Sequence, residues 1–281
     1  MKQFTFFIIL LLIPALAGAG DKNYLSDPYW DSGKAEFQVY QGKIKQYNIP
    51  RNAQVKLIIV KEPFHREKFV KTLNPEMAID VVKMNYIRHV PAGIYDYYQM
   101  ASIFFNRNTG RIIKYTMNSQ DGCGNTFMKY IFKNNRHHFS YHSYFDDQGD
   151  QLKIFDEDFL FYDALPMVLR FRLSEKGSYK TMMMPSLISN RIQPLTLSEA
   201  VITTRRIDKL TEGKTYRKLY VVEVNFEKGK DIFYFENKFP HRMIKWEKKN
   251  KDSLVLKKSD FLYYWNYTGP EHGELPKEVK K

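Results

Sequence analysis

Short segments in which apolar and polar residues alternate follow one another along almost the whole chain, and this pattern limits the fold more than any other property of the sequence. Val, Ile, Tyr, Phe and Thr dominate these segments, and such residues favour extended backbone. The predicted strands are Lys34–Gln41, Gln54–Glu62, Ala78–His89, Tyr95–Arg107, Arg111–Gln120, Thr126–Lys133, His137–Phe145, Ser178–Met184, Ala200–Lys209, Tyr216–Phe226, Asp231–Phe235, Arg242–Glu247 and Leu254–Ser259. The sequence therefore predicts a mainly β protein.

The connections between these segments favour tight turns. Gly, Asn and Asp tolerate the left-handed backbone of hairpins, and Pro presets the backbone of a turn. The expected turns include Pro91-Ala92-Gly93, Asn108-Thr109-Gly110, Asp121-Gly122, Asn134-Asn135, Asp147-Gln148-Gly149, Glu212-Gly213, Lys228-Gly229 and Asn250-Lys251-Asp252. Consecutive strands joined in this way pair antiparallel. One helix is expected over Asp158–Arg170, where apolar residues recur near the helical period although Pro166 interrupts it.

A sheet of so many strands is expected to curve, because twist and unpaired edges penalise a wide flat sheet. We therefore predict a single large curved antiparallel sheet, a half-barrel or open barrel, with one short helix. No linker, repeat or break in composition divides residues 20–268, which are predicted to form a single β-rich domain. Residues 269–281 contain prolines and end in lysines, and they are predicted to be a flexible basic tail.

The N-terminus is typical of an exported protein. Lys2 precedes the apolar run Phe6–Ile13, and a small-residue stretch follows Pro14. Residues 1–19 are predicted to be a signal peptide cleaved after Ala17 or Ala19, and an uncleaved anchor is the alternative. Later apolar stretches are too short to span a bilayer, so no integral span is expected after cleavage. The expected location is the periplasm or another part of the cell envelope.

The chain is basic. Its 44 Lys and Arg against 31 Asp and Glu give a formal charge of +13, or +12 without Lys2. Such a charge favours anionic partners, including an anionic envelope surface, although basic residues spread along the chain are also the ordinary decoration of a sheet. No nucleic-acid partner is expected, because the chain contains no RNP-like strand or basic helix and the predicted location is extracytoplasmic.

Metal and cysteine chemistry have little support. Cys123 is the one cysteine, which excludes an intramolecular disulfide and a Cys-rich metal site and leaves a small turn residue as the preferred interpretation over a nucleophile. His138 and His142 share one strand face about 13 Å apart, too far for one metal unless a third element brings ligands, and His137, His138 and His142 are interpreted as partly exposed sheet residues. An acidic cluster lacks the EF-hand order and is interpreted as a turn followed by the start of the helix: Asp146, Asp147, Asp150, Asp156, Glu157 and Asp158.

Familiar enzyme motifs are absent. The sequence contains no H-E-x-x-H, C-x-x-C or G-x-S-x-G, and Gly213-Lys214-Thr215 lacks the upstream glycine of a phosphate loop because Asp208 occupies that position. No catalytic, cofactor-binding or metal residue is assigned, no cofactor is expected, and ligand-binding residues are left open. If the protein is nevertheless an enzyme, titratable groups such as His142, Glu62 or Asp121 should converge in a cleft.

Several segments carry a resemblance to a known family. They are Tyr29-Trp30, Gly33-Lys34-Ala35-Glu36-Phe37, Tyr40, Ile58–Glu62, Tyr141-His142-Ser143-Tyr144, Asp163-Ala164-Leu165-Pro166, Pro240-His241-Arg242, Trp246, and Leu256–Ser259 with Tyr264-Trp265. Over residues 29–268 the chain resembles uncharacterised exported bacterial β-rich proteins, some of which carry a septum-formation-inhibitor (Maf) label. Maf enzymes are cytoplasmic α/β nucleotide pyrophosphatases, a fold that this strand pattern does not predict. The strand-rich arrangement also resembles, more distantly, half-barrel envelope proteins of the LolA/LolB type. That resemblance implies a protein that holds lipid acyl chains in a curved sheet.

The expected function follows from the export signal, the curved sheet and the 16% of aromatic residues. We expect a non-enzymatic envelope protein that binds a lipid or another apolar ligand in its curved sheet. Aromatic runs such as Tyr95–Met100 place rings on both faces, as when one face packs a core and the other lines a groove, and a helix or loop covering that face is the alternative. A structural or interaction protein acting through a sheet edge or basic face, and an unrecognised envelope hydrolase, stay open.

Overall fold

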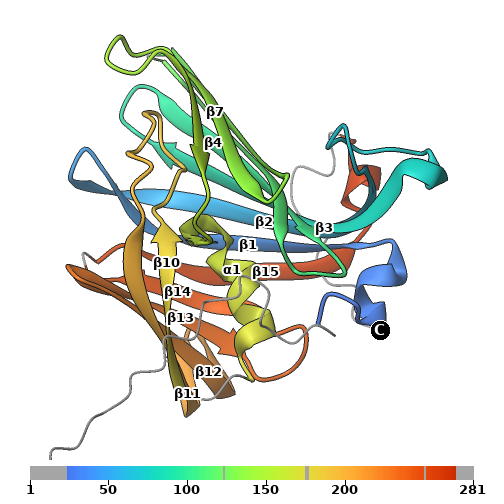
Figure 1. Ribbon diagram of the computed structural model, residues 1–281. Helices are drawn as coiled ribbons and strands as arrows, with labels where there is room; N and C mark the ends of the chain where they lie inside the picture. The colour runs from blue at the N-terminus through green and yellow to red at the C-terminus, as the bar shows by residue number, and fades with distance from the viewer. Residues whose placement is uncertain (1–23, 123, 175–176, 250, 270–281) are drawn as a thin grey trace, which may run out of the picture.

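The computed structural model describes residues 24–122, 124–174, 177–249 and 251–269. Its strands are β1 (Ala35–Gln46), β2 (Ile49–His65), β3 (Ala78–Pro91), β4 (Asp96–Asn106), β5 (Ile112–Asp121), β6 (Gly124–Lys133), β7 (Arg136–Ser143), β8 (Asp150–Phe155), β9 (Leu160–Phe161), β10 (Gly177–Met184), β11 (Ser198–Glu212), β12 (Lys214–Phe226), β13 (Gly229–Glu236), β14 (Met243–Lys248) and β15 (Ser253–Leu262). All belong to one sheet (Figure 1). The predicted mainly β fold is confirmed.

The strand order in the sheet is β8-β7-β6-β5-β4-β3-β2-β1-β15-β14-β13-β12-β11-β10-β9. Each half is a meander of hairpins, and β1 pairs with β15 where the two halves meet. Among the described strands, β8 and β9 lie at opposite edges and do not pair, so the sheet curves without closing, as predicted. One pair departs from the antiparallel expectation, because β9 lies parallel to β10.

The remaining elements are short and helical. They are η1 (Pro28–Ser32), η2 (Pro75–Met77), η3 (Tyr162–Ala164), α1 (Leu165–Val168), η4 (Leu169–Arg172) and η5 (Tyr264–Asn266). The elements η3, α1 and η4 form one continuous helical segment that lies across the concave side of the sheet (Figure 1). The predicted single short helix is confirmed, but it begins at Tyr162 and not at Asp158, because Leu160 and Phe161 pair with β10.

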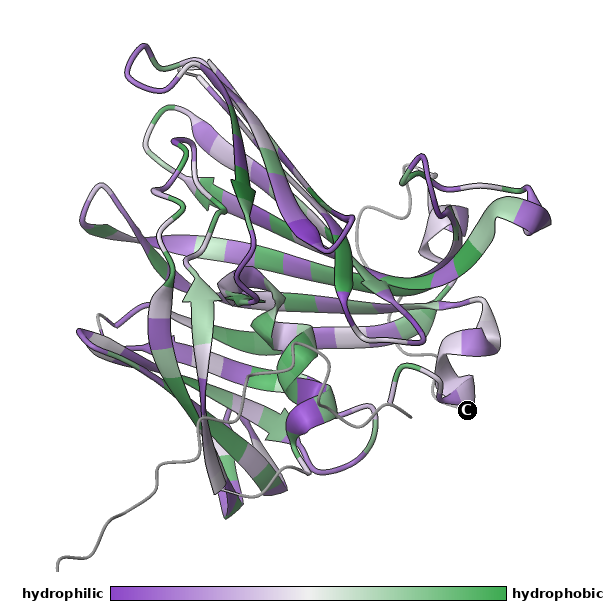
Figure 2. Ribbon diagram, in the orientation of Figure 1, coloured by the Kyte–Doolittle hydropathy of each residue, from purple (hydrophilic) through white to green (hydrophobic). Residues whose placement is uncertain are grey.

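The concave side of the sheet is packed. Alternate residues of the strands meet the apolar side of the helical segment in one large core, and the alternation is visible along the strands in Figure 2. Leu165, Met167 and Leu169 are almost fully buried there, and each such side chain contributes about 1.5–3 kcal/mol when it leaves water. The helical segment therefore fills most of the concave side of the sheet. This agrees with the alternative interpretation of the sequence, in which a helix or loop covers that face.

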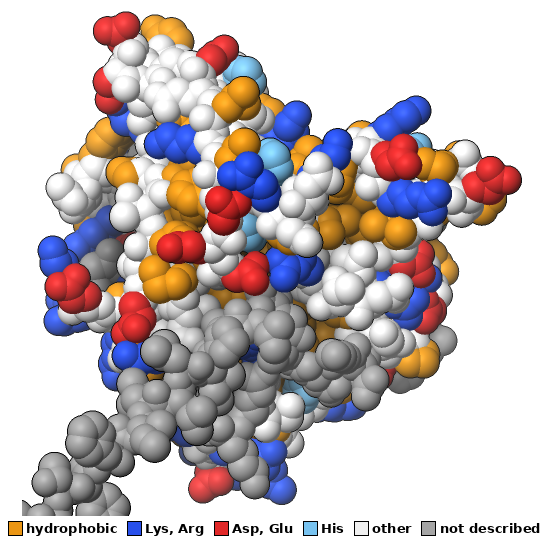
Figure 3. Space-filling model, in the orientation of Figure 1, with side chains coloured by type: hydrophobic (Ala, Val, Ile, Leu, Met, Phe, Trp, Pro, Cys, Tyr) orange, Lys and Arg blue, Asp and Glu red, His pale blue; other side chains and the backbone are white. Residues whose placement is uncertain are grey.

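Two smaller clusters protect the convex side. Phe69, from the connection between β2 and β3, packs with Phe64 and Phe104, and Tyr264 of η5 packs near Ile58 and Val60. Basic and acidic side chains are interspersed over the face shown in Figure 3 and do not form a single charged field. Among the described residues, no helix is long and apolar enough to cross a membrane. The predicted signal peptide at residues 1–19 lies outside the described residues, as does the tail beyond Gly269.

Candidate functional site

A buried ion pair fixes the helical segment against the sheet. Arg170 Nη1 donates to Glu36 Oε1 of β1 at 2.7 Å, and its Nε donates to the carbonyl oxygen of Pro166 at 3.0 Å. Both side chains of the ion pair are essentially inaccessible to solvent. Burial alone disfavours the charge, yet the Glu36 carboxylate holds the pKa of Arg170 above its ordinary value. This contact sets the distance between helix and sheet, and so the size of any space between them.

A second buried carboxylate holds the connection between β10 and β11 over the same region. Asp163 of η3 accepts hydrogen bonds from Ser186 Oγ at 2.6 Å, from Leu187 N at 2.7 Å and from Tyr115 OH of β5 at 3.0 Å. Burial raises the pKa of Asp163 above its usual value, and these donors act against that rise. The carboxylate thus joins a strand, the helix and the loop of residues 185–197.

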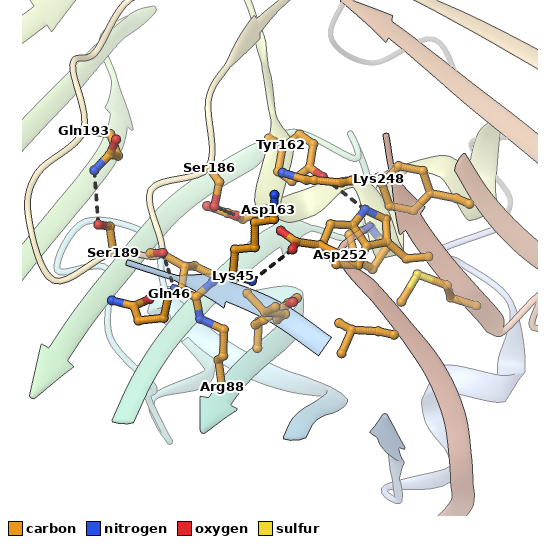
Figure 4. A pocket seen from close by; sticks show the side chains of 18 residues that line it. Lys45, Gln46, Arg88, Tyr162, Asp163, Ser186, Ser189, Gln193, Lys248 and Asp252 are labelled. Atoms are coloured by element: carbon orange, nitrogen blue, oxygen red, sulfur yellow. Dashed lines mark hydrogen bonds between the residues drawn. The ribbon is translucent and has the colours of Figure 1, made fainter. Parts of the chain in front are cut away.

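A cavity of about 300 Å³ lies between the helical segment, the loop of residues 185–197 and the strands β1, β3, β13, β14 and β15 (Figure 4). Eight of the lining residues are apolar or aromatic: Ile44, Tyr86, Pro166, Ile188, Phe233, Met243, Trp246 and Leu254. The other ten are polar or charged: Lys45, Gln46, Arg88, Tyr162, Asp163, Ser186, Ser189, Gln193, Lys248 and Asp252. The lining is therefore amphipathic.

Arg88 of β3 differs from the other charged residues of this cavity because its hydrogen bonds go only to neutral groups. Its Nε donates to Gln99 Oε1 at 2.7 Å and its Nη2 donates to the carbonyl oxygen of Ile188 at 2.7 Å, and both acceptors are neutral. Burial lowers the pKa of Arg88, but a guanidinium keeps its charge at neutral pH. No carboxylate of the described residues forms a salt bridge with it. The Asp163 and Asp252 carboxylates of the same lining stabilise its charge at longer range. No charged group of the described residues accepts a hydrogen bond from this half-buried guanidinium, so it is the group of the lining best suited to contact an anion.

Two lysines add positive charge to the same space. Lys45 is exposed at the end of β1, and Lys248 lies at the end of β14 with its Nζ over the rings of Tyr162 and Trp246, 4.7 and 5.4 Å from their centroids. Figure 4 shows both side chains entering the region from strands other than the one that carries Arg88. Lys248 also lies 3.8 Å from Asp231, a longer separation than a close ion pair.

Tyr162 links the helix to the far wall of the cavity. Its hydroxyl donates to Asp231 of β13 and accepts from Trp246 Nε1 at 3.1 Å. Burial raises the pKa of Asp231, and the nearby Lys248 ammonium and the Tyr162 hydroxyl both oppose that rise. These hydrogen bonds fix the orientation of the Trp246 ring, which forms part of the apolar lining of the cavity.

The residues considered for an enzyme do not converge. Glu62 lies on β2 and accepts from Lys83 Nζ at 2.9 Å, whereas His142 lies on β7 beside Asp150 at 3.0 Å. Five strand spacings separate β2 from β7, which is about 24 Å at the usual interstrand distance. Asp121 ends β5 at the β5–β6 turn. None of the three lines the cavity beside Arg88.

The histidines and the acidic cluster take part in ordinary sheet contacts. His137 is buried, unlike the partly exposed residue expected, and contacts Tyr130 OH at 3.1 Å. His138 and His142 are more exposed and share the opposite face of β7, as predicted for these two. The interpretation of Asp156 and Asp158 as the start of a helix is wrong, because β9 intervenes; they pair instead with Arg136 and Arg111. No group of three or more potential ligands that could hold a metal ion occurs in the described part of the chain, and Cys123 lies outside it.

Sequence reasoning did not single out Arg88, Lys45 or Lys248. For Arg88 a signal was present, since Val82, Met84, Tyr86, Arg88 and Val90 occupy alternate positions of one strand, and the arginine interrupts an otherwise apolar face. For the lysines no signal distinguishes them from the many lysines that simply face solvent. Comparison of the chain with protein-family models, with curated proteins and with solved structures found no match.

Proposed function

We propose that this protein is a non-enzymatic binding protein of the cell envelope that takes a small amphipathic anion into the cavity between its sheet and its helix. The observation that carries the proposal is Arg88, a charged group in the cavity wall whose hydrogen-bond acceptors, Gln99 and the Ile188 carbonyl, are both neutral. A carboxylate or phosphate on the ligand would accept a charge-assisted hydrogen bond from this guanidinium, and hydrogen bonds to charged groups contribute about 1.5–3 kcal/mol. Export is supported by the pattern of residues 1–19.

The apolar residues of the lining indicate that the ligand also has a hydrocarbon part. Trp246, Phe233 and Leu254 offer a wall on which a hydrocarbon chain would bury its surface. A cavity of about 150 Å³ accommodates one benzene-sized molecule. The space of about 300 Å³ here suits a single hydrocarbon chain of medium length, and it is too small for the two long chains of a phospholipid.

Titration calorimetry with octanoate, octyl phosphate and octanol tests this proposal on the purified chain. The three probes share one chain length and differ in head-group charge. We expect saturable 1:1 binding of at least one anion, and at least tenfold weaker binding of the neutral alcohol. Arg88→Gln should weaken anion binding by about tenfold to a hundredfold, the loss expected for one charge-assisted contact, and leave octanol unchanged.

Arg217→Gln is the matched control, because Arg217 is exposed on β12 away from the cavity. Its anion affinity should equal that of the unmodified chain. Arg88→Lys, which keeps the charge, should recover part of the affinity if charge is the cause. Equal affinity for octanol and both anions, or full anion affinity in folded Arg88→Gln, would refute the proposal.

Native mass spectrometry of protein purified from its own envelope fraction addresses the natural ligand. A co-purifying anion of low mass, released on denaturation and identified in the solvent extract, is the expected result. A co-purifying diacyl lipid at one per chain would contradict the size limit set by the cavity.

A further inference from the structure

The cavity opens beside a row of neighbouring hairpin tips. Lys45 and Gln46, which line the cavity, immediately precede the β1–β2 tip at Tyr47 and Asn48. The Tyr47 hydroxyl is hydrogen-bonded to the hydroxyl of Tyr97, which follows the β3–β4 tip. On the other side, Lys45 N donates to Asp252 Oδ1 in the β14–β15 turn at 2.9 Å. These three tips are therefore adjacent, and we call them the rim: residues 43–51, 91–96, 248–249 and 251–252.

The rim exposes large apolar side chains. Ile94 at the β3–β4 tip is fully exposed, and Tyr47 and Ile49 at the β1–β2 tip are 58% and 53% exposed. Tyr47 has a φ of 54°, in a two-residue hairpin where Asn, Asp and Gly are the favoured residues. The chain thus places an aromatic residue in the β1–β2 turn and an aliphatic residue in the β3–β4 turn, where tight-turn chemistry favours small polar ones, and Ile49 follows the first of these turns directly. Clustered exposed apolar residues of this kind mark interaction sites.

Positive charge surrounds these apolar tips. Residues 43–51 contain Lys43, Lys45 and Arg51 and no acidic residue. Exposed Lys249 and Lys251 extend the positive charge to the neighbouring turn. The rim itself contains two acidic residues, and both have partners: Asp252 is buried and accepts from Lys45 N, and Asp96 contacts His89 at 2.6 Å. The rim is therefore basic and apolar at once, which distinguishes it from the mixed charges on the face shown in Figure 3.

We propose that the rim docks on an anionic lipid surface, with Ile94 and Ile49 entering the boundary of the acyl region and Tyr47 lying at head-group level. Aliphatic tips gain free energy by leaving water, tyrosine favours the interface, and each lysine or arginine near an anionic surface contributes about 1 kcal/mol. Docking in this orientation turns the mouth of the cavity toward the bilayer. This surface goes beyond the proposed ligand binding, and the rim residues substituted in its test, Ile49, Ile94, Lys43 and Lys249, do not line the cavity, so either proposal can fail without the other.

Co-sedimentation of the purified chain with vesicles tests the docking. The vesicles contain either phosphatidylcholine alone or phosphatidylcholine with about one third phosphatidylglycerol. We expect at least tenfold stronger partitioning onto the anionic vesicles at 50 mM NaCl, and a loss of about tenfold at 500 mM NaCl, where surface charges are screened. Ile49→Ser combined with Ile94→Ser should lower partitioning by at least tenfold at either salt concentration.

The structure offers a matched control for each part of the rim. Leu73 is 91% exposed in the β2–β3 connection at the opposite end of the sheet, and Leu73→Ser should leave partitioning unchanged. The double variant Lys43→Gln, Lys249→Gln should weaken binding to anionic vesicles and leave binding to neutral vesicles unchanged. Its control is the double variant Lys209→Gln, Arg217→Gln, which removes two exposed charges outside the rim and should weaken binding to anionic vesicles less. Octyl-anion calorimetry on the Ile49→Ser, Ile94→Ser variant should be unchanged, which separates this surface from the cavity.

Three results would overturn the proposal. Equal binding to neutral and anionic vesicles would remove the role of charge, and equal losses from the rim and Leu73 variants would remove the role of the rim. No binding to vesicles of either composition would exclude a lipid surface and assign the exposed residues to a protein partner.

Discussion

Arg170 and Glu36 form a fully buried ion pair, with Nη1 and Oε1 at 2.7 Å, although 134 residues separate them in the sequence. Glu36 is on the central strand β1, and Arg170 is on the helical segment that fills the concave side. Gln38 Oε1 accepts a second, longer hydrogen bond from Arg170 Nη2 at 3.3 Å. The pair thus joins the two layers whose separation defines the cavity.

Arg170→Met should destabilise the fold by about 3–5 kcal/mol, because it leaves the Glu36 carboxylate buried without its counter-charge. Urea unfolding followed by circular dichroism measures the loss. The double variant Arg170→Met, Glu36→Met should be more stable than Arg170→Met alone, since it removes both charges. A double variant as unstable as the sum of the two single variants would show that the pair is not coupled.

Gly42→Ala should destabilise the protein by at least about 2 kcal/mol, since a Cβ at this position would lie 1.8 Å from the carbonyl oxygen of Ser253 in β15. The β1 and β15 backbones would have to separate at the junction of the two halves of the sheet. Gly229→Ala is the control, because a Cβ there meets no atom within 4 Å. Thermal unfolding should show a clear loss for the first variant and a change within about 0.5 kcal/mol for the second.

The pH dependence of stability should include a contribution from Asp31. Hydrogen bonds from Arg107 and Lys61 lower its pKa to about 2, against about 3.9 in an unfolded chain. A lowered folded-state pKa adds stability above the unfolded value, and this stability is lost as the pH falls toward 2. Because the side chain is 42% exposed, the contribution should stay below about 1 kcal/mol.

Asp31→Asn tests this sign. The variant should be slightly less stable than the unmodified chain at pH 6, and the difference should shrink between pH 4 and pH 2. Urea midpoints at these pH values measure it, with Asp208→Asn, an exposed aspartate of β11, as the control. A difference that grows on acidification would contradict the assigned pKa.

Asp163→Ala should release the loop that covers the cavity. The substitution removes the acceptor for Ser186 Oγ and Leu187 N, so hydrogen exchange at Leu187 should accelerate by at least tenfold. Asp147 also contacts this loop, through Arg191 at 2.9 Å, but from an exposed position. Asp147→Ala should change exchange at Leu187 little, because exposed ion pairs contribute about 0–1 kcal/mol. Equal acceleration in both variants would show that Asp163 does not hold this loop more firmly than the exposed Asp147 does.

Most strands of the sheet could be predicted from the sequence, and the two failures have separate physical reasons. The alternation in segments such as Gln54–Glu62 marked strands with one buried face, and Asn134-Asn135 marked a hairpin whose two residues indeed have φ values of 54° and 56°. The strand Asp150–Phe155 was not predicted, because it lies at the edge of the sheet and buries neither face. Its sequence therefore lacks the apolar-polar alternation that marks the other strands. Leu160 and Phe161 were assigned to the helix because their pairing partner, β10, follows the helix in the chain.

The sequence by itself determined that the chain is mainly β, that its strands pair in antiparallel hairpins, and that so many strands must curve, because local periodicity and turn chemistry are encoded in neighbouring residues. Only the tertiary structure decided how far the helix fills the concave side, and which charges face the space that remains. Arg88, Lys45 and Lys248 come from three strands that are not consecutive in the sequence. Their meeting depends on the order and curvature of the whole sheet, which no local pattern records.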